Sequence, residues 1–417
     1  MVAHGKRVLI TSYTHAAVDN LMIMLIEKGV ATTNISCPMS RLARIGSKTA
    51  CHASVHSVLV PQIAATRECW DDEMIHEPKA DSLRDVISSA RIVGVSALTI
   101  PRSPLMVGQN FDVVIVDEAG QISQPAILGA LMAADSFVLV GDHMQLPPLV
   151  NSEIAEQGGL GISMLRRLAD KYPGAVSQLT LQYRMQEQIC NLCNDIVYNG
   201  KLQCATDAVQ NQRLCLTGFP SALPLADRWL TNVVNPSRPI VFINTDPNTT
   251  TKIGLQCSPI VGLERSLGKK GRGGTVNDTE AKIIGRILIG LFACGVPASC
   301  IGVISPFRAQ LRLLEDIPGM ANWRESGLEV STIDRFQGRD KDVIVLSFVR
   351  SNPQGKAGRL LEDFRRLNVA VSRAKSKLIM VGSFSTLHRG SEVLSPVLEG
   401  LRKRHQVQHL PDNFTLK

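Results

Sequence analysis

The sequence predicts an α/β protein built on two parallel β-sheets. Eight short apolar runs rich in β-branched residues stand out, and helical patterns lie between them. Continuous apolar runs of this kind are typical of parallel strands that are covered on both faces. Most of the runs end in a small or polar residue, and ligands of open α/β sheets bind at the carboxyl ends of strands. The predicted strands are residues 7–12, 91–96, 112–117, 136–141, 239–244, 301–305, 342–347 and 377–382.

The predicted strands fall into two groups of four, which predicts two α/β domains. A length of 417 residues is compatible with two or three domains. We expect the first domain at residues 1–202 and the second at residues 239–417, with an irregular connection at 203–238. Residues 37–90 carry little strand signal, and we expect them to form a helical insertion in the first domain.

Composition narrows the class of protein. Lys and Arg exceed Asp and Glu by eight and the pI is about 9.0, which permits a polyanionic partner without requiring one. No run of about 20 uncharged apolar residues is present, so no membrane span is predicted. Ten cysteines in a chain of this length do not indicate a secreted disulfide framework. We therefore expect a soluble intracellular protein.

One predicted strand ends in two adjacent carboxylates, Asp117 and Glu118. This is the arrangement of nucleotide hydrolases in which the first carboxylate holds hydrated Mg²⁺ and the second polarises the attacking water. The pair alone is only moderately specific, because a helix N-terminus also favours acidic residues.

Three further segments carry residues suited to phosphate contact. A strand, a glycine turn and a loop with two prolines present Gln145, which could reach a γ-phosphate. Arg184 and Arg373 each occur beside a helical pattern, and an arginine can bridge two phosphoryl oxygens. Taken singly, each arginine is better explained as a surface ion-pair partner.

In this order and spacing the segments resemble the motor core of superfamily 1 helicases. The resemblance covers nearly the whole chain and points to the 1B branch, and within it to the helicase half of the eukaryotic DNA replication helicase/nuclease family. The nonsense-mediated-decay RNA helicases are the next nearest. Gly120 stands where the family usually has Ser. The motifs are TSYTHAAVDN (11–20), DEAG (117–120), GDHMQLPP (141–148), QYRM (182–185), SPFR (305–308), STIDRFQGRD (331–340) and VSRAK (371–375).

The resemblance implies two tandem RecA-like lobes with ATP between them and single-stranded DNA across both. It implies that the cofactors are ATP and Mg²⁺, the latter held through water by Asp117. The catalytic residues would be Asp117, Glu118, Gln145, Arg184 and Arg373, and the ATP-binding residues Gln337, Gly338 and Arg339. Backbone phosphates of the strand would be contacted by Thr11, Thr14, Ser96, Pro306 and Thr332. For Ser96 and Thr332, capping of a strand end is an alternative interpretation.

The phosphate-binding motif Gly-x-x-x-x-Gly-Lys-Ser/Thr does not occur in these 417 residues. Its backbone amides and lysine hold the nucleotide phosphates in enzymes of this kind. In the family it lies upstream of Thr11, as do the nuclease domain and its iron–sulfur cysteines. We therefore expect the first lobe to lack its Walker A strand and loop, and neighbouring strands to show unpaired edges and apolar faces. We predict that the 417-residue chain alone is poorly stable and does not hydrolyse ATP.

Three function classes follow. The first is the C-terminal motor of a nuclear, conceivably also mitochondrial, ATP-dependent DNA helicase. It would move 5′ to 3′ in replication and repair, as in Okazaki fragment processing and end resection, beside single-strand-binding protein and other replication factors. The second is a truncated nucleic-acid-binding protein without hydrolysis, or an RNA helicase of the same branch. The third, a metal-dependent nuclease, is disfavoured because such sites gather several separated carboxylates.

For Cys190 and Cys193, core packing is favoured over metal binding.

Overall fold

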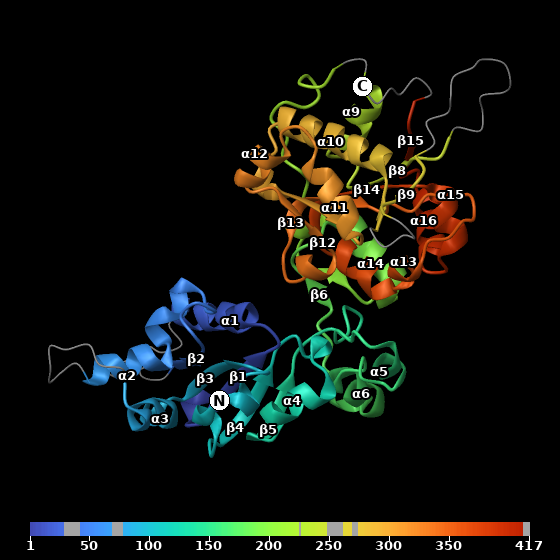
Figure 1. Cartoon of the computed structure of the whole chain (residues 1–417). Helices are drawn as coiled ribbons and strands as arrows, with labels where there is room; N and C mark the ends of the chain where they lie inside the picture. The colour runs from blue at the N-terminus through green and yellow to red at the C-terminus, as the bar shows by residue number, and fades with distance from the viewer. Residues whose placement is uncertain (29–41, 69–77, 225–226, 248–261, 269–273, 412–417) are drawn as a thin grey trace, which may run out of the picture. The chain divides into compact units, whose positions relative to one another are not determined.

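A computed structural model of the chain forms two compact units, residues 1–177 and 178–417 (Figure 1). The structure describes residues 1–28, 42–68, 78–224, 227–247, 262–268 and 274–411. The division falls after Ser177, whereas the sequence analysis drew the first boundary after residue 202. Residues 178–202 group with the second unit, where, for example, the backbone N–H of Gln186 donates to the carbonyl of Lys375.

The first unit is built on a five-stranded parallel sheet in the order β2-β3-β1-β4-β5. All four strands predicted for this part of the chain are present. The strands are β1 (Val8–Ser12), β2 (Leu42–Ile45), β3 (Ile92–Ser96), β4 (Phe111–Val116) and β5 (Ala134–Leu139). The helices are α1 (His15–Glu27), α2 (Val60–Glu68), α3 (Ala80–Ser89), α4 (Gln124–Leu131), α5 (Glu153–Gln157) and α6 (Met164–Lys171).

The helical insertion expected at residues 37–90 is only partly correct. Helices α2 and α3 lie in this range, but Leu42–Ile45 forms β2, an edge strand that pairs with β3. The strand escaped notice because Arg44 interrupts its apolar pattern. That arginine is fully buried and its Nε lies 2.8 Å from Asp19 Oδ1 of α1, so tertiary pairing neutralises a charge that the sequence pattern presents as surface.

Strand β5 forms the other edge of the first sheet and is largely exposed. Phe137 and Val138 retain 48% and 42% of their accessible surface, although they point to opposite faces. Parallel strands are normally covered on both faces. The exposed apolar strand that the sequence analysis expects is therefore β5, which carries a free edge in the part of the chain that the structure describes.

The second unit contains a six-stranded sheet in the order β12-β11-β13-β14-β8-β15, also parallel. The four predicted strands are present, and β12 and β15 at the edges were not predicted. The strands are β8 (Ile240–Asn244), β11 (Ile301–Ser305), β12 (Glu329–Thr332), β13 (Lys341–Ser347), β14 (Ala374–Gly382) and β15 (Val407–His409). Two small pairs accompany it, β6 (Leu181–Gln182) with β7 (Gln203–Cys204), and β9 (Arg265–Ser266) with β10 (Thr275–Val276).

Helices cover this second sheet, and its core is formed by buried apolar side chains. The longest, α10 (Asp278–Ala293), packs its apolar face on β8, β11, β13 and β14 (Figure 1). The others are α7 (Glu187–Cys193), α8 (Asp207–Gln210), α9 (Arg228–Val234), α11 (Arg308–Glu315), α12 (Met320–Glu325), α13 (Arg359–Glu362), α14 (Phe364–Val371), α15 (Phe384–Gly390) and α16 (Leu394–Lys403). Of the helices described, none has the length and apolar character needed to cross a bilayer.

The region expected as an irregular connection, residues 203–238, is partly ordered. Helix α9 buries Trp229, Leu230, Val233 and Val234 in the core of the second unit. The asparagines and prolines of residues 203–238 favour a loop. The apolar side chains of α9 are nevertheless buried, because the helix packs against α10. The two parallel α/β sheets confirm the predicted fold class.

Candidate functional site

In the first unit the two acidic residues lie where the sequence places them, at the carboxyl end of β4. The N–H of Asp117 donates to the carbonyl of Thr11 on the neighbouring β1, which fixes the turn that follows the strand. Glu118 adopts a left-handed conformation (φ 50°) and its Oε2 accepts from Gln121 Nε2 at 2.8 Å. Such a conformation is costly for a non-glycine residue and is common at functional sites.

Burial raises the pKa of Asp117 above its usual value. A buried carboxylate without a cation is penalised by desolvation, and a divalent cation would reverse this effect. Two adjacent carboxylates that supply oxygen ligands, together with substrate phosphates, match the way proteins commonly bind Mg²⁺. The donor set therefore fits the ion that the family resemblance implies, although the described residues contain no cluster of three or more potential metal ligands.

Gln145 lies in the loop after β5, and this loop packs against the acidic turn. Asp142 organises the loop, since its Oδ1 accepts from Met144 N at 2.9 Å and its Oδ2 accepts from Gln145 Nε2 at 3.0 Å. The N–H of Ala119 donates to the carbonyl of Val140. A Cβ at Gly120 would approach the carbonyl oxygen of Asp142 to 3.0 Å. Glycine at this position therefore suits the close contact between the two loops, whereas a Cβ there would require the Asp142 backbone to shift by a few tenths of an ångström.

The predicted strand-contacting residues of this unit lie at the same edge of the sheet. Thr11 and Ser96 are near the ends of β1 and β3, which are in register. Thr11 is fully buried and its hydroxyl makes no hydrogen bond to the described residues. Thr14 caps α1 by accepting from Ala17 N, and the hydroxyl of Ser96 pairs with that of Thr99 at 2.7 Å. The capping interpretation of Ser96 thus has a partner in the structure.

In the second unit, arginine and lysine side chains gather where β13 and β14 begin. Arg184 Nε lies 3.0 Å from Asp340 Oδ2, and Lys375 Nζ lies 2.7 Å from Asp340 Oδ1. Burial alone would raise the pKa of Asp340, but these two partners outweigh it and lower that pKa. Arg184 also donates to the carbonyl of Ser372 at 3.3 Å, so its position is fixed by the second unit.

Arg373 is held more rigidly than Arg184. It is 2% exposed, and its guanidinium donates to the carbonyls of Val369 and Arg339 and to Ser372 Oγ at 3.0–3.1 Å. These hydrogen bonds fix the rotamer of the Arg373 side chain, directly before β14. Such preorganisation suits an arginine that must present its charge to a phosphoryl group without reorganising.

The predicted ATP-binding residues lie beside these arginines. Both amide atoms of Gln337 are buried and form no hydrogen bond to the described residues. Gly338 has φ 77°, a conformation that favours glycine. Arg339 pairs with Glu329 Oε2 at 3.0 Å. An unsatisfied buried amide is costly, so Gln337 is the group in this cluster that most needs a polar ligand.

The opposite, carboxyl edge of the second sheet carries the remaining predicted residues. Thr332 ends β12 and stands in register with Ser305, which ends β11. Pro306 follows directly. The structure therefore separates the two predicted roles of this unit, with the arginine cluster at the amino ends of β13 and β14 and the strand-contacting residues at the carboxyl ends.

Sequence reasoning missed several residues of these clusters. Asp340 and Lys375 lie inside quoted motifs but received no role, because their pairing with Arg184 joins segments far apart in the chain. Asp142 was likewise overlooked as the organiser of the Gln145 loop. In the sequence, the feature that could have identified all three residues is a charged side chain within a motif at a strand end.

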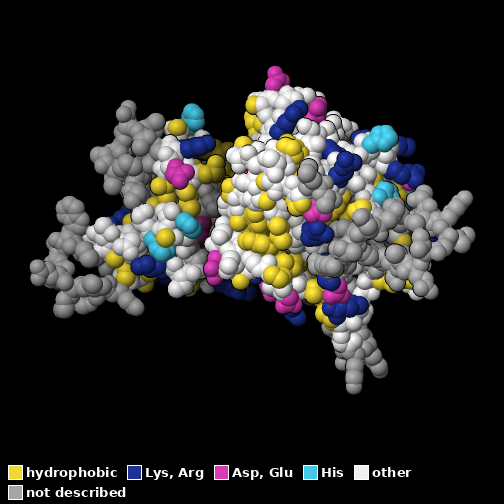
Figure 2. Space-filling view, turned by 90° about the horizontal axis from the view of Figure 1, so that it is seen from above, with side chains coloured by type: hydrophobic (Ala, Val, Ile, Leu, Met, Phe, Trp, Pro, Cys, Tyr) yellow, Lys and Arg dark blue, Asp and Glu magenta, His cyan; other side chains and the backbone are white. Residues whose placement is uncertain are grey.

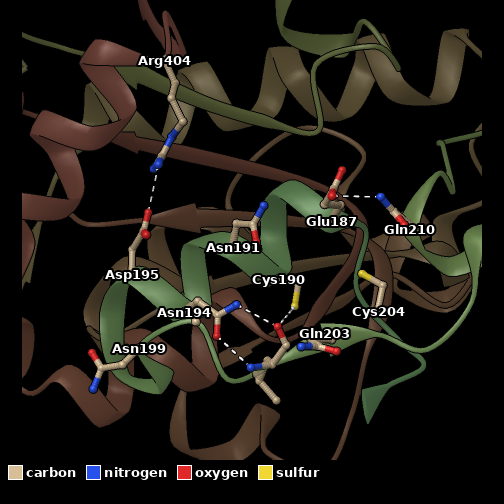
Figure 3. Close-up of a pocket in the computed structure, with 12 residues that line it drawn as sticks. Glu187, Cys190, Asn191, Asn194, Asp195, Asn199, Gln203, Cys204, Gln210 and Arg404 are labelled. Carbon is tan, nitrogen blue, oxygen red and sulfur yellow. Dashed lines mark hydrogen bonds and ion pairs between the residues drawn. The ribbon is translucent and has the colours of Figure 1, made fainter. Parts of the chain in front are cut away.

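A cavity of about 790 Å³ lies in the second unit beside α7 and contains none of the predicted site residues (Figure 3). Asp195 and Arg404 form an ion pair at its margin, 2.9 Å apart. Cys190 lines it, and burial raises the pKa of that thiol to about 12. Because the thiolate is the form that attacks or binds metals, this shift favours a packing role for Cys190. Cys193 is also buried, with Sγ 3.6 Å from Met185 Sδ.

The positive net charge is not concentrated on the face seen in Figure 2. There, Lys and Arg side chains lie dispersed among acidic and apolar ones. On this face, no broad basic surface marks a phosphate-binding region.

Comparison with known proteins places these features in a family. Two family models match, both described as AAA domains, over residues 60–153 and 160–385. The second match alone covers more than half of the chain.

Similar proteins include DNA replication ATP-dependent helicase/nucleases of Xenopus laevis (37% identity over 99% of this chain) and Saccharomyces cerevisiae (39% over 95%). The chain spans 36% and 24% of those two proteins. The solved structure of Arterivirus nonstructural protein 10, a helicase, aligns with 94% of this chain and 55% of its own, at 13% identity and a TM-score of 0.41. On the evidence of the matching models, the chain belongs to the AAA domain family.

Proposed function

We propose that the chain is the C-terminal motor portion of an ATP-dependent DNA helicase that moves on single-stranded DNA. The observation that carries the proposal is the grouping of the motif residues into matched clusters, carboxylates with Gln145 in the first unit and arginines with Gln337 in the second. The similarity to DNA replication helicase/nucleases over 99% of the chain supports the same assignment.

Each cluster has a distinct role in this proposal. Glu118 orients the attacking water, and Gln145 contacts the γ-phosphate. Bound Mg²⁺, held by Asp117, would neutralise phosphate charge. Arg184 and Arg373 stabilise the charge that develops on the transferred phosphoryl group, and Gln337, Gly338 and Arg339 contribute to nucleotide binding.

The single-stranded DNA would lie along the carboxyl-terminal edges of the two β-sheets. Hydroxyl groups and backbone amides at strand ends suit contact with phosphates irrespective of base sequence. Thr11, Thr14 and Ser96 would serve in the first unit, and Pro306 and Thr332 in the second. We further propose 5′-to-3′ movement, a nuclear location and work in replication and repair, alongside single-strand-binding protein.

A second candidate, nucleic-acid binding without hydrolysis, is favoured for the 417-residue chain by itself. No phosphate-binding motif occurs in it, and among the residues that the structure describes β5 has an unpaired, apolar edge where a further parallel strand would fit. We propose that a strand carrying the phosphate loop pairs with β5 in the active enzyme.

The test is a binding competition combined with an ATPase assay. The purified chain should bind labelled single-stranded DNA and release it as salt rises, because phosphate contacts dominate. Matched single-stranded RNA should compete less well. Tighter RNA binding would instead favour an RNA helicase of the same branch, and absence of binding to both would reject the proposal.

A further inference from the structure

Helix α10 begins with the sequence pattern of a capping box that the structure does not complete. Asn277 is the cap and its Oδ1 accepts from Glu280 N at 3.0 Å. In a capping box the glutamate side chain returns to the N–H of the cap residue. Here that N–H donates to Gln310 Oε1 at 2.8 Å instead. The side chain of Glu280 is thus released from its usual local role.

Glu280 turns to the end of β13. Its Oε2 accepts from Ser347 Oγ at 2.6 Å and from Val349 N at 2.9 Å. The side chain is completely buried, and burial raises its pKa to about 8. A buried carboxyl group is expensive unless its hydrogen bonds are satisfied, and here the bonds that satisfy it tie the side chain to the end of β13.

The segment that Glu280 holds is strained. Val349 has φ 69°, a conformation that is an outlier for a β-branched residue. The N–H of Arg350 donates back to the carbonyl of Phe348 at 2.7 Å, which closes a three-residue turn of the rare, strained kind. Asn277 Nδ2 donates to the carbonyl of Val349 at 3.1 Å. Strain of this kind persists only where surrounding contacts enforce it.

The strained turn lies at the same edge of the sheet as the residues that we assign to contact with single-stranded DNA. Ile304 of β11 is in register with Leu346 of β13, and Ser305 with Thr332 of β12. Ser347 and the turn after it therefore extend the row formed by Thr332 and Ser305 at the carboxyl edge of the second sheet.

We propose that Glu280 is a positioning residue that holds the turn at Val349 and thereby shapes the edge of the second unit that grips a single strand. This inference rests on the proposed function, since it assumes that this edge binds nucleic acid. Glu280 itself is buried and touches no ligand. Without the Glu280 side chain, the backbone after Ser347 would relax toward an extended conformation. The turn would then move away from its position beside Ser305 and Thr332.

The experiment measures binding of a fluorescein-labelled oligothymidylate to the full chain carrying Glu280→Ala, Glu280→Gln, or Glu280→Ala with Val349→Gly. We expect Glu280→Ala to weaken binding about tenfold, which corresponds to about 1.4 kcal/mol. Glutamine has the same shape, and its single side-chain oxygen can accept from Ser347 Oγ and Val349 N. Only the longer contact of Glu280 Oε1 with Asn277 Nδ2, at 3.4 Å, is lost, so Glu280→Gln should stay within about twofold. Glycine adopts positive φ without strain, so Val349→Gly should restore most of the binding lost in Glu280→Ala.

Hydrogen exchange at the Val349 amide provides a readout that does not depend on nucleic acid. It should be slow in the unmodified chain and in Glu280→Gln, and fast in Glu280→Ala. Glu315→Ala, which removes an exposed glutamate on α11, is the matched control and should change neither measurement.

Two results would overturn the inference alone: Glu280→Ala binding the oligonucleotide as tightly as the unmodified chain, or weak binding that Val349→Gly does not restore. If Glu280→Ala fails to fold, Ser347→Ala replaces it, and equal exchange and binding in that variant would also reject the inference. An unmodified chain that does not bind the oligonucleotide at all would reject the proposed function, and with it the role of Glu280.

Discussion

The two sheets differ at the strands that carry their site loops. In the first unit β5 leads to Gln145, and Phe137, Val138 and Val140 around it remain 42–48% exposed. In the second unit β14 follows directly on Arg373 and is almost entirely buried, between β13 and β8. Both strands have the apolar character of buried parallel strands. Among the described residues of the first unit, β5 therefore lacks a covering neighbour of the kind that β14 has in the second unit.

The largest expected effect concerns this missing neighbour. The chain alone should show no ATP hydrolysis above background, and fusing the phosphate-loop segment of a relative upstream of Met1 should produce measurable turnover. The reason is that the loop's backbone amides and lysine hold the phosphates. Glu118→Gln in the fusion should abolish the activity in a coupled phosphate-release assay. Turnover by the chain alone that Glu118→Gln abolishes would refute the comparison.

Two phenylalanines test the difference in packing directly. Phe242 of β8 is fully buried against the rings of Phe348 and Phe384, so Phe242→Ala should lower the free energy of unfolding by about 3–5 kcal/mol. Phe137→Ala on β5 should change it by less than about 0.5 kcal/mol, as for other exposed positions. Chemical denaturation of each variant measures both. A comparable loss for Phe137→Ala would mean that β5 is covered in solution.

The two edges of the first sheet should also respond differently. Arg44 on β2 is fully buried and bonded to Asp19, so Arg44→Ala leaves a buried carboxylate without its partner and should cost about 3–5 kcal/mol. The control, Lys6→Ala, removes an exposed pair with Asp112 and should leave the unfolding midpoint nearly unchanged. Equal shifts in the two variants would show that β2 is not the anchored edge.

The smallest expected effect, compared over a single pH unit, is the pH dependence contributed by Glu280. Its pKa is about 8 in the folded chain against a reference of 4.5, so between these values the folded state binds more protons than the unfolded state. Stability from this group therefore falls as pH rises through that window. Relative to the unmodified chain, Glu280→Gln should gain up to about 1.4 kcal/mol per pH unit there. Melting temperatures at several pH values check this, and a constant difference would contradict the buried acid.

Much of the fold could be predicted from the sequence, because buried parallel strands have continuous apolar runs. All eight predicted strands exist. The edge strands were the failures: β2 contains the charged Arg44, and β12 and β15 are short and partly polar. The helix α9 was also missed, since only packing against α10 reveals its apolar stripe. Edge strands and packed loops depend on tertiary partners that local patterns do not encode.

The sequence by itself determined the two-sheet class and the order of the motif residues at strand ends, because apolar periodicity and residue chemistry are local properties. Tertiary structure alone decided which side chains meet. It joined Arg184 to Asp340, placed the arginines at one edge of the second sheet and Thr332 at the other, and diverted Glu280 from its helix cap to Val349. These pairings join residues up to 156 positions apart, and only the folded backbone brings such residues within hydrogen-bonding distance.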